Sequence, residues 1–171
     1  LNNVSFRYPG MSSPVLQDID LTVQPGEFLA IVGPSGCGKS TMIRLLLGFE
    51  RPEAGTVTYD SKDLQSLDVR AVRAQISVAM QNGAVTGSDI LSVIRGDRPL
   101  TEDEVWEAAE QVGIAEDIRK LPMGLRTMIG DNAVTFSGGQ RQRLVLAAAV
   151  ARKPRIVILD EATSALDSVT Q

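Results

Sequence analysis

The chain contains the run Gly33-Pro34-Ser35-Gly36-Cys37-Gly38-Lys39-Ser40-Thr41. Residues 28–32 before it are apolar and residues 42–47 after it are mainly apolar, so the order predicts a buried strand, a glycine loop and a helix. Glycine lacks a Cβ, so the loop can turn its N–H groups inward, and the helix that follows adds the positive end of its dipole, so that donors surround an anion. We therefore predict a phosphate-binding loop, with Lys39 on the β- and γ-phosphates and the Ser40 hydroxyl on Mg²⁺. The alternative is a flexible glycine–serine turn.

Composition excludes several classes of protein. The 17 basic and 21 acidic residues give a formal net charge of −4, which offers no reason to expect a nucleic acid partner. A single cysteine excludes an internal disulfide, and the lack of histidine excludes a histidine-based triad or zinc site. The longest apolar run, residues 144–151, is far shorter than the roughly 20 residues that span a bilayer, so we expect these residues to be soluble. Both ends of the chain lack a completed element, so we expect an excerpt of a longer protein.

Hydrophobic periodicity predicts an α/β chain with a helical insertion. Alternating or β-branched runs predict strands at residues 4–8, 16–23, 28–32, 56–59, 76–80 and 156–159. Helical spacing and capping residues predict helices that start near residues 39, 68, 90, 101, 115 and 137. We therefore predict a β-rich N-terminal part with the phosphate loop over residues 1–81, a helical subdomain over 82–154, and a return to the first part over 155–171.

An acidic pair, Asp160-Glu161, follows the apolar strand predicted at residues 156–159. We expect this strand to lie beside the strand that carries the glycine loop, which places the acids next to the phosphates. Adjacent residues of a strand face opposite ways, so the two acids should differ in role. We assign Asp160 to the Mg²⁺ shell and Glu161 to the attacking water.

A second potential anion site opens the predicted helix after Phe136. Ser137 is a good N-cap, and the glycines at 138 and 139 leave the first N–H groups of the helix accessible. A tight turn is the alternative explanation for these glycines. Two phosphate sites have no obvious use in one copy of the chain, whereas two copies that face each other head to tail would use both.

In these motifs the chain resembles the nucleotide-binding domain of an ABC transporter, a P-loop NTPase with a RecA-like core, over nearly all its length. The motifs occur in the family's order: the adenine-stacking aromatic at Tyr8, Walker A at 33–41, the Q-loop glutamine Gln81, the signature motif at 136–140, the Walker B strand at 156–160, the catalytic glutamate Glu161 and the D-loop at 164–167. In the family, the signature motif of one subunit contacts the γ-phosphate held by the other.

The resemblance implies a set of site residues and partners. Those implied for ATP are Tyr8, Val15, Gly33, Ser35, Gly36, Cys37, Gly38, Lys39, Ser40, Thr41, Ser137, Gly139 and Gln140; those for Mg²⁺ are Ser40, Gln81 and Asp160; those for catalysis are Glu161, Lys39 and Gln81. The implied partners are a second copy, head to tail, and membrane helices on the same polypeptide, at the cytoplasmic face of the inner membrane.

Finer matches favour one branch of the family. Residues 86–94 and 121–130 are similar to exporters, and residues 81–83 and 122–124 to secretion proteins for peptides or bacteriocins. Phe136 replaces the usual leucine of the signature motif, and Asp131 stands where exporters carry a glutamate. The alternatives are a soluble ABC ATPase of DNA repair or translation, an importer subunit, and a module that binds ATP without hydrolysing it.

Two hypotheses concern reactivity. The family's switch histidine is absent, so we expect this fragment to bind Mg-ATP but to hydrolyse it weakly. Cys37 lies beside Lys39 at a helix N-terminus, an environment that makes a thiol more reactive, although an inert small residue is equally consistent with the position.

Overall fold

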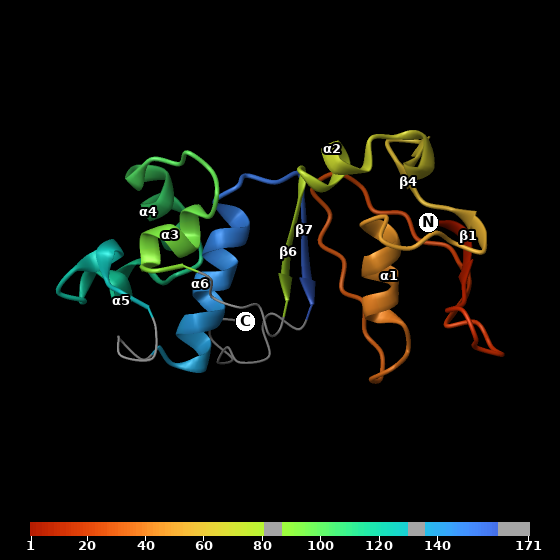
Figure 1. Cartoon of the computed structure of the whole chain (residues 1–171), viewed down its shortest axis with the longest axis horizontal. Helices are drawn as coiled ribbons and strands as arrows, with labels where there is room; N and C mark the ends of the chain where they lie inside the picture. The colour runs from red at the N-terminus through yellow and green to blue at the C-terminus, as the bar shows by residue number, and fades with distance from the viewer. Residues whose placement is uncertain (81–86, 130–135, 161–171) are drawn as a thin grey trace. The chain divides into compact units, whose positions relative to one another are not determined.

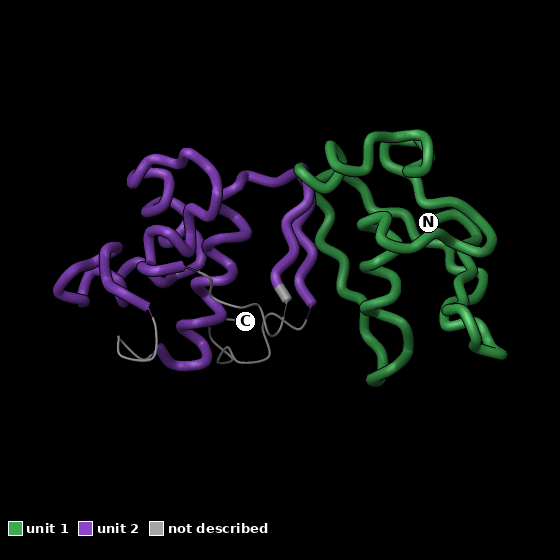
Figure 2. The backbone as a smooth tube through the Cα atoms, viewed as in Figure 1, with its two compact units in different colours: residues 1–74 green, residues 75–171 purple. Residues whose placement is uncertain are grey.

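The computed structural model describes residues 1–80, 87–129 and 136–160. The chain divides into two compact units, residues 1–74 and residues 75–171 (Figure 2). Figure 1 gives the labels of the elements.

The first unit combines small antiparallel sheets with two helices. Its elements are β1 (Asn2–Phe6), β2 (Leu16–Ile19), α1 (Lys39–Leu46), β3 (Ala54–Thr56), β4 (Thr58–Tyr59), β5 (Lys62–Asp63), the 3₁₀ turn η1 (Leu64–Ser66) and α2 (Val69–Arg73). β1 lies between β2 and β3, and both pairings are antiparallel. Alternate residues of β1 face one side, so Val4 and Phe6 are both buried, in one cluster with Leu45 of α1. This cluster fixes α1 against the sheet.

The second unit combines two parallel strands with a group of helices. Its elements are β6 (Ile76–Met80), α3 (Ile90–Arg95), α4 (Glu102–Gln111), α5 (Ala115–Arg119), the 3₁₀ turn η2 (Gly124–Arg126), α6 (Gly138–Val150) and β7 (Ile156–Asp160). β6 and β7 pair in parallel from Ile76 opposite Ile156 to Met80 opposite Asp160. The carboxyl ends of the two strands therefore lie at the same edge of this sheet.

Helix α6 connects the helical core of this unit to its strands. Leu144 and Ala147 belong to the buried cluster that α6 forms with α3, α4 and α5. Ala149, on another side of the helix, packs with Ala79 of β6. Alanine at these positions allows the close approach of backbones, so α6 can pack on both neighbours.

Capping residues define the starts of the helices of the second unit. Asp89, Thr101 and Ser137 each cap a helix and form a capping box with the third helical residue. In the box of α4, the backbone N–H of Thr101 donates to Glu104 Oε2 over 2.9 Å. This hydrogen bond and that from the Thr101 hydroxyl lower the pKa of the Glu104 carboxyl. The predicted helix starts at Thr101 and Ser137 are thus confirmed.

Three strand predictions need correction. Residues 28–32 form no strand: Phe28 is 88% exposed and Val32 90% exposed, because among the described residues of the first unit no strand pairs with this run. The strand predicted at 16–23 ends at Ile19, where pairing with β1 ends. The strand predicted at 56–59 is divided between β3 and β4, which pair with different partners. The strands near 4–8, 76–80 and 156–159 are confirmed.

Candidate functional site

The glycine loop leads directly into α1, as the sequence predicts. Gly38 is the N-cap residue, with φ of 101°, a left-handed conformation that favours glycine. A Cβ at Gly38 would lie 2.8 Å from Leu16 Cδ2 and 3.2 Å from the carbonyl oxygen of Val15. The position therefore requires glycine for two reasons, its backbone angle and the closeness of β2.

Lys39 folds back over the loop. Its ammonium Nζ donates to the carbonyl oxygens of Gly33 at 2.7 Å and Pro34 at 3.0 Å, and it lies 3.8 Å from the sulfur of the exposed Cys37. A phosphate would compete well for these donors, because ammonium hydrogen bonds to an anion are stronger than those to a neutral carbonyl. The loop thus holds a positive charge at the start of α1.

The two ends of α1 differ in how their backbone groups are satisfied. At the C-terminal end, Gly48 N–H donates to Leu45 O and Phe49 N–H to Arg44 O, the two bonds of a Schellman motif, with φ of 64° at Gly48. The hydroxyl of Tyr59 donates to Leu46 O over 2.9 Å. No side-chain cap is present at the N-terminal end, at Gly38. A helix that is closed at its C-terminus and has only a glycine loop at its N-terminus suits an anion at that loop.

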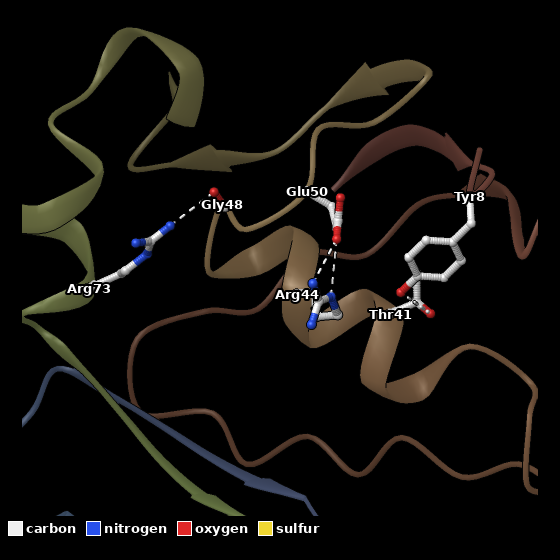
Figure 3. A network of polar contacts seen from close by, with 6 residues as sticks. All are labelled: Tyr8, Thr41, Arg44, Gly48, Glu50 and Arg73. Atoms are coloured by element: carbon white, nitrogen blue, oxygen red, sulfur yellow. Dashed lines mark hydrogen bonds and ion pairs between the residues drawn. The ribbon is translucent and has the colours of Figure 1, made fainter.

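Arginine side chains complete the C-terminal end of α1 (Figure 3). Arg73 donates from Nε to Leu47 O over 2.7 Å and from Nη2 to Gly48 O over 3.0 Å. Arg44 and Glu50 form an ion pair of 2.8 Å. No local sequence motif reveals the contacts of Arg73, because they join positions 25 and 26 residues apart.

Tyr8 is placed next to the start of α1. Its ring packs edge-to-face on Phe6, with centroids 4.9 Å apart and an interplanar angle of 86°. Its hydroxyl oxygen lies 3.3 Å from the hydroxyl oxygen of Thr41 (Figure 3). Val15 is held beside β1 by the hydrogen bond from its N–H to Phe6 O, 2.8 Å long. The first unit therefore brings Tyr8, Val15 and the glycine loop together.

The remaining predicted residues belong to the second unit. Asp160 is the last residue of β7, opposite Met80, the last residue of β6. Gln81 and Glu161 follow these positions in the chain and lie outside the described residues. The expected position of Asp160 beside the phosphate loop joins the two units and stays a prediction.

Ser137 forms the N-cap of α6. Its hydroxyl accepts from the N–H of Gln140 over 3.2 Å, and the side chain of Gln140 accepts from the N–H of Ser137 over 3.0 Å. The glycines at 138 and 139 form the first turn of the helix. The cap arrangement is local to this unit, and a phosphate contact at Ser137 or Gly139 stays a prediction.

The donor set predicted for Mg²⁺ is compatible with that ion. Ser40 lies in the first turn of α1 and offers a hydroxyl, while Asp160 offers a carboxylate. Both are hard oxygen donors, the type that Mg²⁺ prefers. Within the described ranges no group of three or more histidine, cysteine, aspartate or glutamate side chains could hold a metal ion by itself. A Mg²⁺ site with these residues would thus need oxygen ligands from the nucleotide.

A family model and two relatives of known name all place the chain in one family. The model of the family described as ABC transporter matches residues 16–164. The chain is 42% identical over 175 residues to the ABC multidrug transporter atrD of Emericella nidulans, covering 99% of this chain and 13% of that protein. It is 43% identical over 172 residues to the ATP-dependent lipid A-core flippase of Dechloromonas aromatica, covering 99% of this chain and 29% of the flippase.

A solved structure agrees with these relatives. The structure of a bacterial Atm1-family ABC exporter with ATP bound has a TM-score of 0.89 to this chain at 35% identity, covering 99% of this chain and 30% of the exporter chain. The similarity confirms the predicted α/β fold with a P-loop NTPase core. The chain thus spans less than a third of each of these three proteins.

Proposed function

The chain belongs to the ABC transporter family, as a nucleotide-binding domain of the exporter type, and we propose that it binds Mg-ATP and hydrolyses it to drive transport across a membrane. The observation that carries the proposal is α1, whose C-terminal end is closed by hydrogen bonds while its N-terminal end meets a glycine loop and the Lys39 ammonium. That end attracts an anion by hydrogen bonding and by the helix dipole.

The residues predicted for the site have distinct parts in this proposal. Lys39 exchanges its two loop carbonyls for oxygens of the β- and γ-phosphates, and the ring of Tyr8 stacks on the adenine. Ser40 and Asp160 are the oxygen donors that would hold Mg²⁺, which when bound would neutralise charge on the phosphates. Glu161 and Gln81 position the attacking water. Phosphoryl transfer needs little beyond such positioning and charge stabilisation.

A second copy of the chain completes the site in this proposal. Ser137 and Gly139 of one copy contact the γ-phosphate held by the glycine loop of the other. One fact supports it: the N-terminus of α6, capped by Ser137, carries two glycines in its first turn.

The class of the transported molecule is inferred from the relatives of the chain. By their names, the relatives cited above move drugs and a lipid, and neither is named as a peptide exporter. Export of a drug or a lipid therefore has more support than export of a peptide or bacteriocin. Within the described residues no helix is long and apolar enough to cross a bilayer. By similarity to the exporters, we infer that the chain acts together with membrane helices at the cytoplasmic face of the membrane.

Removal of the Lys39 ammonium tests the proposal. We expect Lys39→Ala to weaken binding of Mg-ATP by about tenfold or more, since a hydrogen bond to a charged group contributes about 1.5–3 kcal/mol. Isothermal titration calorimetry measures the Kd. The control is Lys62→Ala on β5, which removes an equal charge from an exposed strand. Equal affinity in wild type and Lys39→Ala would contradict a phosphate role for this loop.

A further inference from the structure

Arg73 makes an unusual set of contacts with the end of α1. Its guanidinium donates to the carbonyl oxygens of Leu47 and Gly48, over 2.7 Å and 3.0 Å, and its Cζ lies 4.1 Å from the centroid of the Phe49 ring. Three consecutive residues that follow α1 are thus held by one side chain, which is itself partly buried.

These contacts suit arginine in particular. The carbonyls at a helix C-terminus carry partial negative charge, so a cation that binds them is stabilised by the helix dipole as well as by hydrogen bonds. The planar guanidinium can donate to two carbonyls and stack on an aromatic ring at the same time. A lysine ammonium at this position could keep the charge but not the fork and the stacked plane.

Arg73 lies close to the end of the first unit. Arg73 is the last residue of α2, and the first unit ends one residue later, at Ala74. The chain then enters β6, whose last residue, Met80, lies opposite Asp160 of β7. Arg73 therefore anchors the chain to the C-terminal end of α1 at the point where the chain leaves the first unit.

We propose that Arg73 is a positioning residue for ATP hydrolysis: its clamp on residues 47–49 fixes the exit of the chain from the first unit relative to α1. The inference rests on the proposed function, in which hydrolysis needs Lys39 of the first unit together with Asp160 of the second. Binding of nucleotide depends on the other end of α1, where Tyr8 and Lys39 lie. Loss of the clamp should therefore slow turnover more than it weakens binding.

The test compares Arg73→Gln with Arg70→Gln in the complete natural protein. Arg70 lies on the same helix, its side chain is exposed, and removing it takes away the same charge without touching α1. The measurements are the Kd for Mg-ATP, the stoichiometry of bound nucleotide, and kcat per bound nucleotide. We expect Arg73→Gln to lower kcat per bound nucleotide by about tenfold, the effect of about one charge-assisted hydrogen bond, with Kd within about threefold of wild type. Arg70→Gln should match wild type in both quantities.

A purely structural role predicts a different pattern. Arg73→Gln would then lower the melting temperature and the stoichiometry of bound nucleotide, while kcat per bound nucleotide stays at the wild-type value; that result overturns the proposal. If Arg73→Gln does not fold, Arg73→Lys decides. A kcat per bound nucleotide lowered by about two- to fivefold supports the proposal, since lysine keeps the charge but not the fork, and a wild-type kcat overturns it. A wild-type protein that binds ATP but does not hydrolyse it overturns the proposed function itself, and this inference with it.

Discussion

At the scale of single residues, variants of Tyr8 can separate the effect of its aromatic ring on Mg-ATP binding from the effect of its hydroxyl group. The ring packs on Phe6, and the hydroxyl lies 3.3 Å from that of Thr41 in the second position after Lys39. We expect Tyr8→Ala to weaken Mg-ATP binding by roughly tenfold, since the stacking of a base on an aromatic ring contributes about 1–3 kcal/mol. Titration with a fluorescent ATP analogue measures the change in Kd.

Tyr8→Phe is the matched variant. It keeps the ring and removes only the hydroxyl, so binding should change by less than about threefold, the lower part of the range for one neutral hydrogen bond. A loss as large as that of Tyr8→Ala would show that the hydroxyl contact with Thr41, and not stacking, determines the affinity.

At the scale of elements, α1 shows what local sequence can predict and what it cannot. Its start at Lys39 and its end near Gly48 follow from glycines that adopt left-handed conformations, and such signals are local. The capping boxes at Thr101 and Ser137 are likewise predictable from spacing. The contacts of Arg73 and Tyr59 with the end of α1 join distant parts of the chain, so no periodicity reveals them. For residues 28–32, the apolar run predicts a strand, but a strand also needs a pairing partner, which composition does not supply.

The C-terminal end of α1 should make stability sensitive to alkaline pH. Burial raises the pKa of Tyr59 to about 12, from 10.0 in the unfolded chain. The neutral phenol donates to Leu46 O, and the phenolate cannot. The stabilisation is fully present below pH 10 and is lost as the pH rises through 12, by roughly 2 kcal/mol after allowance for the partial exposure of the ring. Urea unfolding at a series of pH values between 8 and about 12 measures the loss.

Tyr59→Phe provides the control for this prediction, because it removes the hydroxyl group of Tyr59 and leaves the rest of the chain unchanged. The variant should be less stable than wild type at pH 8 by about 1 kcal/mol, the net value of a hydrogen bond. Its further loss of stability above pH 10 should be smaller than that of wild type. Parallel pH curves for the two proteins would exclude Tyr59 as the responsible group.

At the scale of the whole molecule, the residues predicted for the site are distributed over two units, so each unit contains only part of the predicted site. The first unit contains the complete phosphate loop with Tyr8 and Val15. The second contains Asp160 and Ser137, the N-cap of α6. The sequence predicted these members because each lies in a local motif. It could not supply their mutual geometry, because tertiary contacts between distant segments determine that geometry.

The capped helix α6 offers a test of the proposed site between two copies. In the purified 171-residue chain that carries Glu161→Gln, which should block hydrolysis, we expect Mg-ATP to convert monomers into dimers. Adding Ser137→Ala should abolish the dimer, because it removes the hydroxyl proposed to contact the γ-phosphate of the other copy. Size-exclusion chromatography with light scattering measures the mass of the species.

Loss of the cap itself has to be separated from loss of that phosphate contact. Thr101 caps α4 with the same kind of capping box, so Thr101→Ala should cost a similar amount of stability, about 1 kcal/mol. With Thr101→Ala in the Glu161→Gln background, the ATP-dependent dimer should persist. If both alanine variants lose the dimer equally, destabilised helices explain the result; if Ser137→Ala retains it, the serine does not contact the nucleotide of the other copy. Only selective loss with Ser137→Ala supports a site shared between two copies, because α4 and α6 then differ in function while their caps are alike.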